Sequence, residues 1–304
     1  MMDKAVIFEN IGKSFGQTLA LQNVSFSINE REIFGLIGPD GAGKTTLMRI
    51  LATLYLPDRG QAFLNGENVV KNYRKIRKKI GYMPGEFSLY PDLTVEENLQ
   101  FFASVFNTTI QENYDLIKGL YSHIKPFKTR KAGDLSGGMK QKLALSCALI
   151  HRPKVLILDE PNTGVDAVSR DELWKMLHYL QGEGLTILVS TPYMDEAEKC
   201  DRIALMQKGK VMSIDSPDNI VKGFSHPLYK IECENIYKAL NLLKENRQTG
   251  DAYLFGQSIH LVPAGEKFNP TDLENNLSRH GIENCAIEPV RPDIEDCFMD
   301  LMKT

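Results

Sequence analysis

The sequence of 304 residues lacks an apolar run long enough to cross a bilayer. Its longest apolar stretches, such as Val155 to Leu158 and Leu185 to Val189, fall far short of the roughly 20 residues that a membrane helix needs. The first residues, Met1 to Lys4, also precede a short β-like run and not the long apolar core of a secretory signal. We therefore expect a cytosolic chain with no membrane-spanning segment.

An excess of positive charge and a regular cysteine pattern are missing as well. The formal net charge of −3 predicts that the chain has no nucleic-acid partner, although local basic patches remain open. The five cysteines are odd in number and widely spaced, which favours neither a zinc site nor a disulfide framework. We expect all five to behave as small buried hydrophobic residues: Cys147, Cys200, Cys233, Cys285 and Cys297.

Short apolar runs alternate with helical patterns over the first two thirds of the chain. Thr94-Val95-Glu96-Glu97 has the spacing of a capping box and predicts the start of a helix. A second helix is expected from about Ala167 to Gln181, between two buried strands. This alternation predicts an α/β fold with a largely parallel sheet. The expected strands are Val6–Ile11, Val24–Ile28, Ile33–Ile37, Lys154–Leu158 and Thr186–Ser190.

A turn-rich stretch from Gly223 to Pro227 predicts a domain boundary, with one domain over residues 1–224 and another over residues 225–304. The second domain is expected to be a small α+β unit that resembles a ferredoxin-like split βαβ arrangement. Its elements alternate as strand, helix, two strands, helix, strand and a last helix. The ranges are Leu228–Glu232, Ile236–Glu245, Ala252–Phe255, Ser258–Val262, Thr271–Arg279, Asn284–Pro289 and a helix from Asp293.

A glycine-rich segment follows the strand at Ile33–Ile37 and has the Walker A pattern. Its glycines let successive backbone N–H groups turn toward a phosphate, and the start of the following helix adds its dipole. Lys44 supplies positive charge, and the hydroxyl of Thr45 is suited to Mg²⁺. A chance glycine turn of this form would occur about once per hundred chains of this length. The candidate phosphate-binding residues are Gly38, Pro39, Asp40, Gly41, Ala42, Gly43, Lys44, Thr45 and Thr46.

Two carboxylates end the apolar strand at Lys154–Leu158. Because side chains alternate along a strand, Asp159 and Glu160 point in different directions and are open to different roles. At the carboxyl edge of a parallel sheet, Asp159 is placed to hold Mg²⁺ and Glu160 to orient or deprotonate an attacking water. The alternative is that these residues only cap a helix after the strand.

Ser136-Gly137-Gly138 opens a long helix that continues through Leu143 and Leu149. A helix that begins with serine and two glycines offers a second anion-binding start. Taken alone, the same triplet is equally compatible with a simple helix N-cap.

The Walker A segment, the Leu135-Ser136-Gly137-Gly138 signature and the Asp159-Glu160 strand resemble ABC ATPases in their order and spacing. The resemblance covers residues 4 to about 222. It implies a P-loop ABC cassette with a mixed sheet core, a helical signature subdomain and an N-terminal antiparallel β region. It also implies ATP and Mg²⁺ as cofactors and a head-to-tail dimer, in which Walker A of one cassette and Ser136 to Gly138 of a second cassette enclose each ATP. Membrane permease subunits would be the other partners, with the chain on the cytoplasmic face of the plasma membrane.

Two further positions match the family's site residues. Phe15 corresponds to the aromatic that stacks on adenine, and the alternative is a buried core phenylalanine. Asp166 corresponds to the D-loop aspartate, and it is also placed to cap the next helix.

Two segments resemble the branch of the family that drives multidrug, antibiotic and sodium exporters. The first runs from Leu89 to Leu99, and the second, from Pro289 to Phe298, is similar to the end of the accessory C-terminal domain in that branch. The resemblance therefore implies an exporter that is energised by ATP-driven dimerisation of the cassettes.

The family's pattern is broken at two positions. Gly85 stands where the Q-loop glutamine is expected, and Pro192 stands where the switch histidine contacts the γ-phosphate. Neither residue offers a side-chain donor. Glu86, the next residue after Gly85, is a possible substitute ligand for Mg²⁺. We expect slow hydrolysis at the chain's own site, and the alternative is a degenerate cassette that acts as the structural or regulatory half of an asymmetric transporter.

Overall fold

The computed structural model describes residues 3–245, 250–265 and 268–303. The chain divides into two compact units, Met1–Asp218 and Asn219–Thr304, and the division falls within helix α7 (Pro217–Lys222). The sequence-based domain boundary at residues 224 and 225 lies just after this helix and stays a prediction. Within the described residues, no helix combines the length and the apolar character that a bilayer crossing requires.

A six-stranded sheet forms the centre of the first unit, with the strand order β10-β9-β3-β8-β7-β6. All neighbouring strands are parallel except β10, which runs antiparallel to β9. Strands β3, β7 and β8 are buried along their whole lengths, as their continuous apolar runs predict. The bounds are β3 (Ile33–Ile37), β6 (Ile80–Met83), β7 (Val155–Asp159), β8 (Thr186–Thr191), β9 (Arg202–Gln207) and β10 (Lys210–Asp215).

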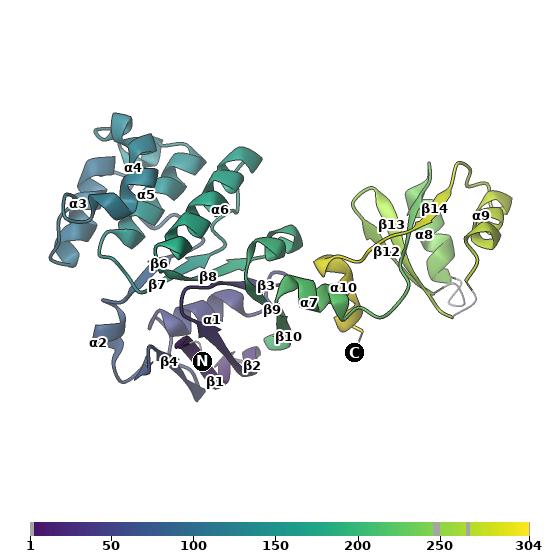
Figure 1. The fold of residues 1–304 in the computed structure, drawn as a ribbon, viewed down its shortest axis with the longest axis horizontal. Helices are drawn as coiled ribbons and strands as arrows, with labels where there is room; N and C mark the ends of the chain where they lie inside the picture. The colour runs from purple at the N-terminus through teal and green to yellow at the C-terminus, as the bar shows by residue number, and fades with distance from the viewer. Residues whose placement is uncertain (1–2, 246–249, 266–267, 304) are drawn as a thin grey trace. The chain divides into compact units, whose positions relative to one another are not determined.

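A second sheet of the same unit is antiparallel, with the order β2-β1-β4-β5. Helix α1 (Lys44–Leu51) packs between this sheet and the six-stranded one, and its Leu47 and Met48 are fully buried in the shared core (Figure 1). The predicted N-terminal antiparallel β region is therefore confirmed. Its strands are β1 (Lys4–Phe15), β2 (Thr18–Asn29), β4 (Arg59–Leu64) and β5 (Glu67–Asn68).

Four longer helices lie on the other face of the six-stranded sheet from α1 (Figure 1). The capping box that the sequence predicts at the start of α3 is confirmed: Glu97 N donates to Thr94 Oγ1 at 3.2 Å, and Thr94 N donates to the Glu97 carboxylate at 2.8 Å. The helices are α3 (Val95–Val105), α4 (Tyr114–Ile124), α5 (Gly137–Leu149) and α6 (Ala167–Gly182). Shorter elements are α2 (Tyr73–Ile76) and the 3₁₀ turns Lys125–Phe127, Ala132–Asp134 and Met194–Lys199.

The second unit is a four-stranded antiparallel sheet with the order β12-β13-β11-β14. Its chain order of strand, helix, two strands, helix and strand is that of a split βαβ motif. Helices α8 and α9 bury Leu240, Leu243 and Leu277 in one core with Ile231 and Ile259 of the sheet. The bounds are β11 (Tyr229–Glu232), α8 (Ile236–Glu245), β12 (Gly250–Phe255), β13 (Ser258–Pro263), α9 (Pro270–Arg279), β14 (Ala286–Pro289) and α10 (Ile294–Leu301).

The five cysteines are free thiols, and they are not all buried. Cys147, Cys200 and Cys297 are buried, and burial raises the pKa of the Cys147 thiol strongly. Cys233 and Cys285 are only partly buried, so the expectation of five buried cysteines is wrong for these two. Both lie just beyond the paired residues at one end of the sheet: Cys233 directly follows β11, and Cys285 directly precedes β14.

Candidate functional site

The segment from Gly38 to Thr46 joins the carboxyl end of β3 to the start of α1. Gly43 is the N-cap of α1 and adopts a φ of 102°. A Cβ on Gly43 would lie 2.7 Å from the carbonyl oxygen of Ala20, so only glycine fits this position. No side chain caps the first turn of α1, and its backbone N–H groups stay available to an anion.

Lys44 is buried, with 3% of its surface exposed. Its Nζ donates to the carbonyl oxygens of Gly38 at 2.7 Å and Pro39 at 3.1 Å, and it lies 3.3 Å from Glu160 Oε1. A buried ammonium needs such partners because it has lost its hydration. The lysine ammonium therefore lies beside the loop, where the oxygens of a bound phosphate would be able to replace its present partners.

Thr45 and Asp159 meet, although 114 positions separate them. Thr45 Oγ1 donates to Asp159 Oδ1 at 2.9 Å, and Ser190 Oγ of the neighbouring strand β8 donates to the same oxygen at 2.8 Å. Asp159 is almost fully buried. A carboxylate and a hydroxyl side by side are oxygen ligands of the kind that Mg²⁺ prefers, so the two residues fit the metal site that the sequence predicts.

Glu160 follows β7 directly and adopts a left-handed backbone, with a φ of 49°. This conformation is uncommon for a residue with a side chain. Its backbone N–H donates to Ser190 Oγ at 3.0 Å, which holds the turn, and its carboxylate reaches Lys44. The alternative that Asp159 and Glu160 cap a helix is wrong, because α6 is capped by Asp166.

The two positions that break the family's pattern lie at the same sheet edge. A Cβ on Gly85 would lie 3.0 Å from the carbonyl oxygen of Asp159, so residue 85 sits directly against the end of β7. Pro192 follows Thr191, the last residue of β8, and is half-buried. Glu86 is exposed. The edge that brings Lys44, Thr45, Asp159 and Glu160 together thus carries no side-chain donor at residues 85 and 192.

Ser136 to Gly138 face a different neighbour. Ser136 is the N-cap of α5 and accepts a hydrogen bond from Met139 N at 3.4 Å. A Cβ on Gly138 would lie 2.8 Å from Ser169 Oγ, which shows how closely this helix start approaches the first turn of α6. Among the described residues, no hydrogen bond joins Ser136, Gly137 or Gly138 to the Gly38–Thr46 loop of the same chain. The N-cap role is therefore real, and the proposed anion role would have to serve a second chain.

The structure shows Asp166 as a helix cap and Phe15 as an exposed ring, and the roles of both toward a nucleotide stay predictions. Asp166 caps α6, because its Oδ1 accepts from Val168 N at 3.1 Å and Ser169 N at 3.0 Å. Hydrogen bonds from the Ser169 backbone and hydroxyl lower the pKa of Asp166. Phe15 is 44% exposed and meets the edge of Tyr55 at 5.3 Å between ring centroids, so the reading as a core phenylalanine is wrong. An exposed ring is able to stack on a base.

A buried polar network that the sequence did not predict joins α5, the turn after Glu160 and α6. Gln141 of α5 donates to Pro161 O at 2.6 Å, and Asn162 Nδ2 donates to Glu196 Oε1 at 2.7 Å. Arg170 of α6 lies 3.6 Å from the same carboxylate oxygen, and Glu196 is fully buried. The network links the signature helix, the turn after Glu160 and α6. No local pattern pointed to it, because Gln141 stands between Lys140 and Lys142 and resembles an exposed polar position.

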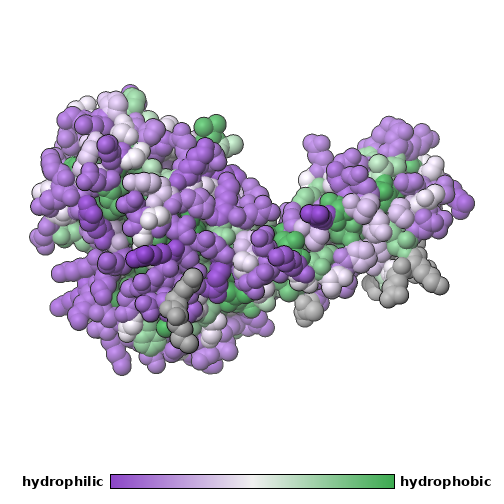
Figure 2. Space-filling model, viewed as in Figure 1, coloured by the Kyte–Doolittle hydropathy of each residue, from purple (hydrophilic) through white to green (hydrophobic). Residues whose placement is uncertain are grey.

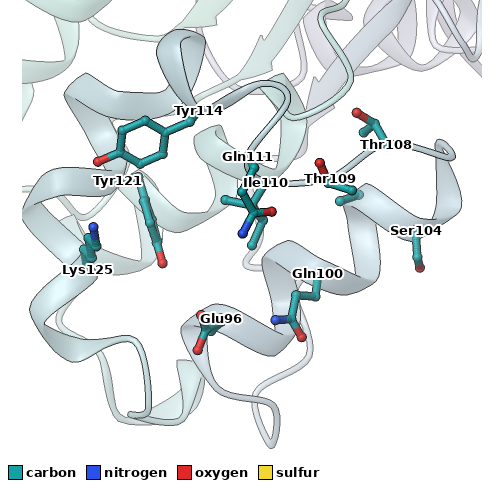
Figure 3. A pocket seen from close by; sticks show the side chains of 11 residues that line it. Glu96, Gln100, Ser104, Thr108, Thr109, Ile110, Gln111, Tyr114, Tyr121 and Lys125 are labelled. Atoms are coloured by element: carbon teal, nitrogen blue, oxygen red, sulfur yellow. The ribbon is translucent and has the colours of Figure 1, made fainter.

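A cavity of about 580 Å³ lies apart from this site, beside α3 and α4 (Figure 3). Its lining is mixed and includes the polar side chains of Gln100, Gln111 and Lys125, with Tyr114 and Tyr121 meeting edge to face at its α4 side. None of the candidate site residues lines it.

Comparison with known proteins gives one family. The family model "ABC transporter" matches residues 21–163. The "Probable multidrug ABC transporter ATP-binding protein YbhF" of Escherichia coli K12 is 39% identical over 308 residues, which cover 99% of this chain and 53% of that protein. The chain thus spans about half the length of this relative. The "Nod factor export ATP-binding protein I" of Burkholderia lata is 39% identical over 219 residues, which cover 71% of this chain and 72% of that protein.

Solved structures agree with the fold. An "ATP binding subunit of ABC transporter" aligns with a TM-score of 0.67 at 26% identity and covers 72% of this chain and 93% of its own. The ATP-binding cassette MJ0796, solved as a dimer in a post-hydrolysis state with ADP and Pi, aligns with a TM-score of 0.63 at 26% identity. It covers 69% of this chain and 98% of its own.

Proposed function

The chain belongs to the ABC transporter family of ATP-binding proteins, and from this premise we propose that it binds and hydrolyses ATP to drive a membrane exporter. The observation that carries the proposal is the convergence of Lys44, Thr45, Asp159 and Glu160 at one edge of the sheet. A lysine, a hydroxyl and two carboxylates in this arrangement match the groups that phosphoryl transfer from a nucleotide needs.

The triphosphate would occupy the loop from Gly38 to Thr46. Backbone N–H groups at the start of α1 would donate to the β-phosphate, and Lys44 would exchange its carbonyl partners for phosphate oxygens. Thr45 and Asp159 would hold Mg²⁺, directly or through water, and Ser190 keeps the Asp159 carboxylate in position. A magnesium ion bound there supplies positive charge that neutralises the phosphate oxygens.

Glu160 is proposed as the residue that orients or deprotonates the attacking water. Its backbone N–H is fixed by Ser190, and its carboxylate stays within reach of Lys44, on the side where the γ-phosphate would lie. Water activated by a positioned carboxylate is the usual arrangement for ATP hydrolysis.

A second cassette would complete each site. Gly138 lies against Ser169 of α6, and Gly137 lies near Gly164 in the loop before α6. Among the described residues neither is hydrogen-bonded to the Walker A loop of its own chain, which would leave the Ser136–Gly138 helix start to contact the nucleotide of another chain. Asp166 would reach the same interface, and Phe15 would stack on the adenine. The dimeric MJ0796 structure supports this arrangement by similarity.

Permease subunits are the proposed membrane partners, with this chain on the cytoplasmic face of the plasma membrane. An exposed aromatic surface lies in the segment after Gly85, where Tyr90 (48% exposed) and Phe101 (39%) meet edge to face at 4.9 Å. Exposed apolar side chains of this kind mark interaction sites. Because the segment begins against Asp159, a permease bound there would respond to the nucleotide state. The relatives named for multidrug and Nod factor export favour an exporter.

The test is ATP turnover by the purified chain, with Glu160→Gln as the matched variant. We expect nucleotide binding and ATP-dependent dimerisation in both proteins, and turnover only in the unchanged chain. Turnover near 1 s⁻¹ or above, within the ordinary range of enzymes, would remove the need for a different partner cassette. Turnover that Glu160→Gln leaves unchanged would overturn the assignment of Glu160, and failure to bind ATP with Mg²⁺ would overturn the proposal.

A further inference from the structure

Exposed positive charge gathers at helix α2. Six of the nine residues from 71 to 79 are basic, and none is acidic. Lys79 is half-buried and pairs with Glu67 at 3.4 Å, whereas the other five are exposed. Those five, here called the α2 basic surface, are Lys71, Arg74, Lys75, Arg77 and Lys78.

Apolar side chains border these cations. The guanidinium groups of Arg74 and Arg77 lie 5.7 Å and 5.3 Å from the ring centroid of Tyr73, which is 39% exposed. Arg77 also donates to Thr53 Oγ1 at 2.8 Å and to Thr53 O at 3.1 Å. It thereby lies beside the turn after α1, which carries two of the most exposed leucines of the chain, Leu54 (53%) and Leu56 (65%).

The α2 basic surface lies away from the nucleotide site. Helix α2 leads into the amino end of β6, whereas Lys44, Asp159 and Glu160 lie at the carboxyl ends of the parallel strands. Strand β6 is the outer strand of the six-stranded sheet, opposite β10. The same strand continues into the segment with Tyr90, where we place the permease contact. Figure 2 shows that hydrophilic residues dominate the visible face of this unit. The α2 basic surface differs in composition, because exposed leucines border its cations.

We propose that the α2 basic surface binds the anionic phospholipid headgroups of the membrane in which the permease lies. The inference uses the proposed function only to place the chain beside a membrane. Clusters of four to eight basic residues attract anionic lipid surfaces, and each contributes about fivefold to the partition constant. Tyrosine and leucine side chains at the border suit the headgroup region, because their apolar parts enter the acyl-chain boundary while the tyrosine hydroxyl stays in contact with water. Nucleic acid would use the cations alone and leave the leucines exposed.

The experiment measures binding of the full chain to vesicles of phosphatidylglycerol and of phosphatidylcholine by co-sedimentation. The test variant is Lys71→Gln with Lys75→Gln and Lys78→Gln, because these three side chains make no hydrogen bond or ion pair with the described residues. We expect the unchanged chain to bind the anionic vesicles in low salt and to lose them in high salt. The triple variant should bind about 10²-fold more weakly.

The matched control is Lys210→Gln with Lys222→Gln and Lys244→Gln, which changes the net charge equally but lies outside the α2 basic surface. It should bind anionic vesicles like the unchanged chain. A second variant, Leu56→Ser, should weaken vesicle binding severalfold without changing its salt dependence, since Leu56 is largely exposed and its loss leaves the core intact.

Three results would overturn the inference: equal binding to both kinds of vesicle, equal binding by the triple variant, or tighter binding to a short DNA duplex than to anionic vesicles. ATP affinity of the same variants is measured in parallel. If vesicle binding fails while ATP still binds and dimerises the chain, the membrane contact is wrong and the proposed function stands.

Discussion

Lys44 Nζ and Glu160 Oε1 lie 3.3 Å apart, which joins the start of α1 to the turn after β7. The two groups have opposite charge and are both candidates for contact with the terminal phosphate. A phosphate that enters the loop would compete with Glu160 for the ammonium and leave the carboxylate available to water. Under the proposed function, the ion pair would couple nucleotide binding to the position of the proposed base.

Replacing Lys44 with alanine should lower ATP affinity by about 10- to 10²-fold, because a charge-assisted hydrogen bond contributes about 1.5–3 kcal/mol. Titration with a fluorescent nucleotide measures the effect. Lys210→Ala, on the outer strand β10, is the control and should bind like the unchanged chain. An unchanged affinity in Lys44→Ala would contradict the assignment of the loop.

Restoring a donor at residue 192 should accelerate hydrolysis. Pro192→His is expected to raise ATP turnover by about 10²-fold, since one preorganised donor to a developing charge contributes about that much. Gly85→Gln should help less, because its Cβ would press on the Asp159 carbonyl oxygen at 3.0 Å. Turnover at saturating ATP with Mg²⁺ is the measurement. The increase in ATP turnover should disappear when Glu160→Gln is combined with Pro192→His. If the increase remained, a residue other than Glu160 would be activating the water.

The buried network around Glu196 should contribute to stability. Glu196→Ala removes the acceptor of Asn162 and the nearer of the two carboxylates beside Arg170, and it should cost about 2 kcal/mol of unfolding free energy, because the buried amide of Asn162 loses its hydrogen bond. Urea unfolding gives the value. Glu198→Ala, an exposed residue of the same 3₁₀ turn, should change the free energy by less than about 0.5 kcal/mol. Equal effects of the two variants would contradict the role of the network.

The second unit should lose stability in acid through Asp296. Burial opposes ionisation of this carboxylate, but the hydrogen bonds that it accepts from His260 at 2.6 Å, from Asp293 N and from the Tyr253 hydroxyl lower its pKa below the ordinary value. A lowered pKa in the folded state stabilises the fold above about pH 4, the unfolded value, and this stabilisation disappears as the pH falls through the folded pKa.

Denaturant unfolding of the full chain followed by circular dichroism, repeated from neutral to acid pH, tests this dependence. Asp296→Asn should be less stable at neutral pH and should show a shallower loss in acid. Tyr253→Phe removes the hydrogen bond from the Tyr253 hydroxyl to Asp296, and its stability at neutral pH should lie between those of the unchanged chain and Asp296→Asn. If Asp296→Asn kept the full acid dependence, other carboxylates would be responsible. Burial raises the pKa of Asp293, so this residue contributes the opposite pH dependence: its effect on stability becomes less favourable as the pH rises.

Local signals in the sequence predicted the elements well. The capping box at Thr94 was found because a cap depends on residues three positions apart. The last helix was also expected from Asp293, and the structure adds a capping box there that the sequence analysis did not use. The glycine loop before Lys44 was recognisable for the same reason, since the backbone needs glycine wherever a Cβ has no room. The family's motifs extended this to a mixed sheet core, an antiparallel N-terminal β region and a helical subdomain, and the order of the strands came only from the structure.

The sequence by itself therefore determined the residue types of the proposed nucleotide site, several helix caps and the strands β1, β2, β3, β7, β8 and β11 to β14, because each follows from neighbours along the chain. It did not reveal the strands β4, β5, β6, β9 and β10. Only the tertiary structure decided that Thr45 meets Asp159, that Glu196 joins α6 to the turn after Glu160, and that Arg77 lies beside Thr53. These contacts depend on which strands become neighbours in the sheet and how the helices pack on it. Such pairings are set by burial of the whole core, and no short segment encodes them.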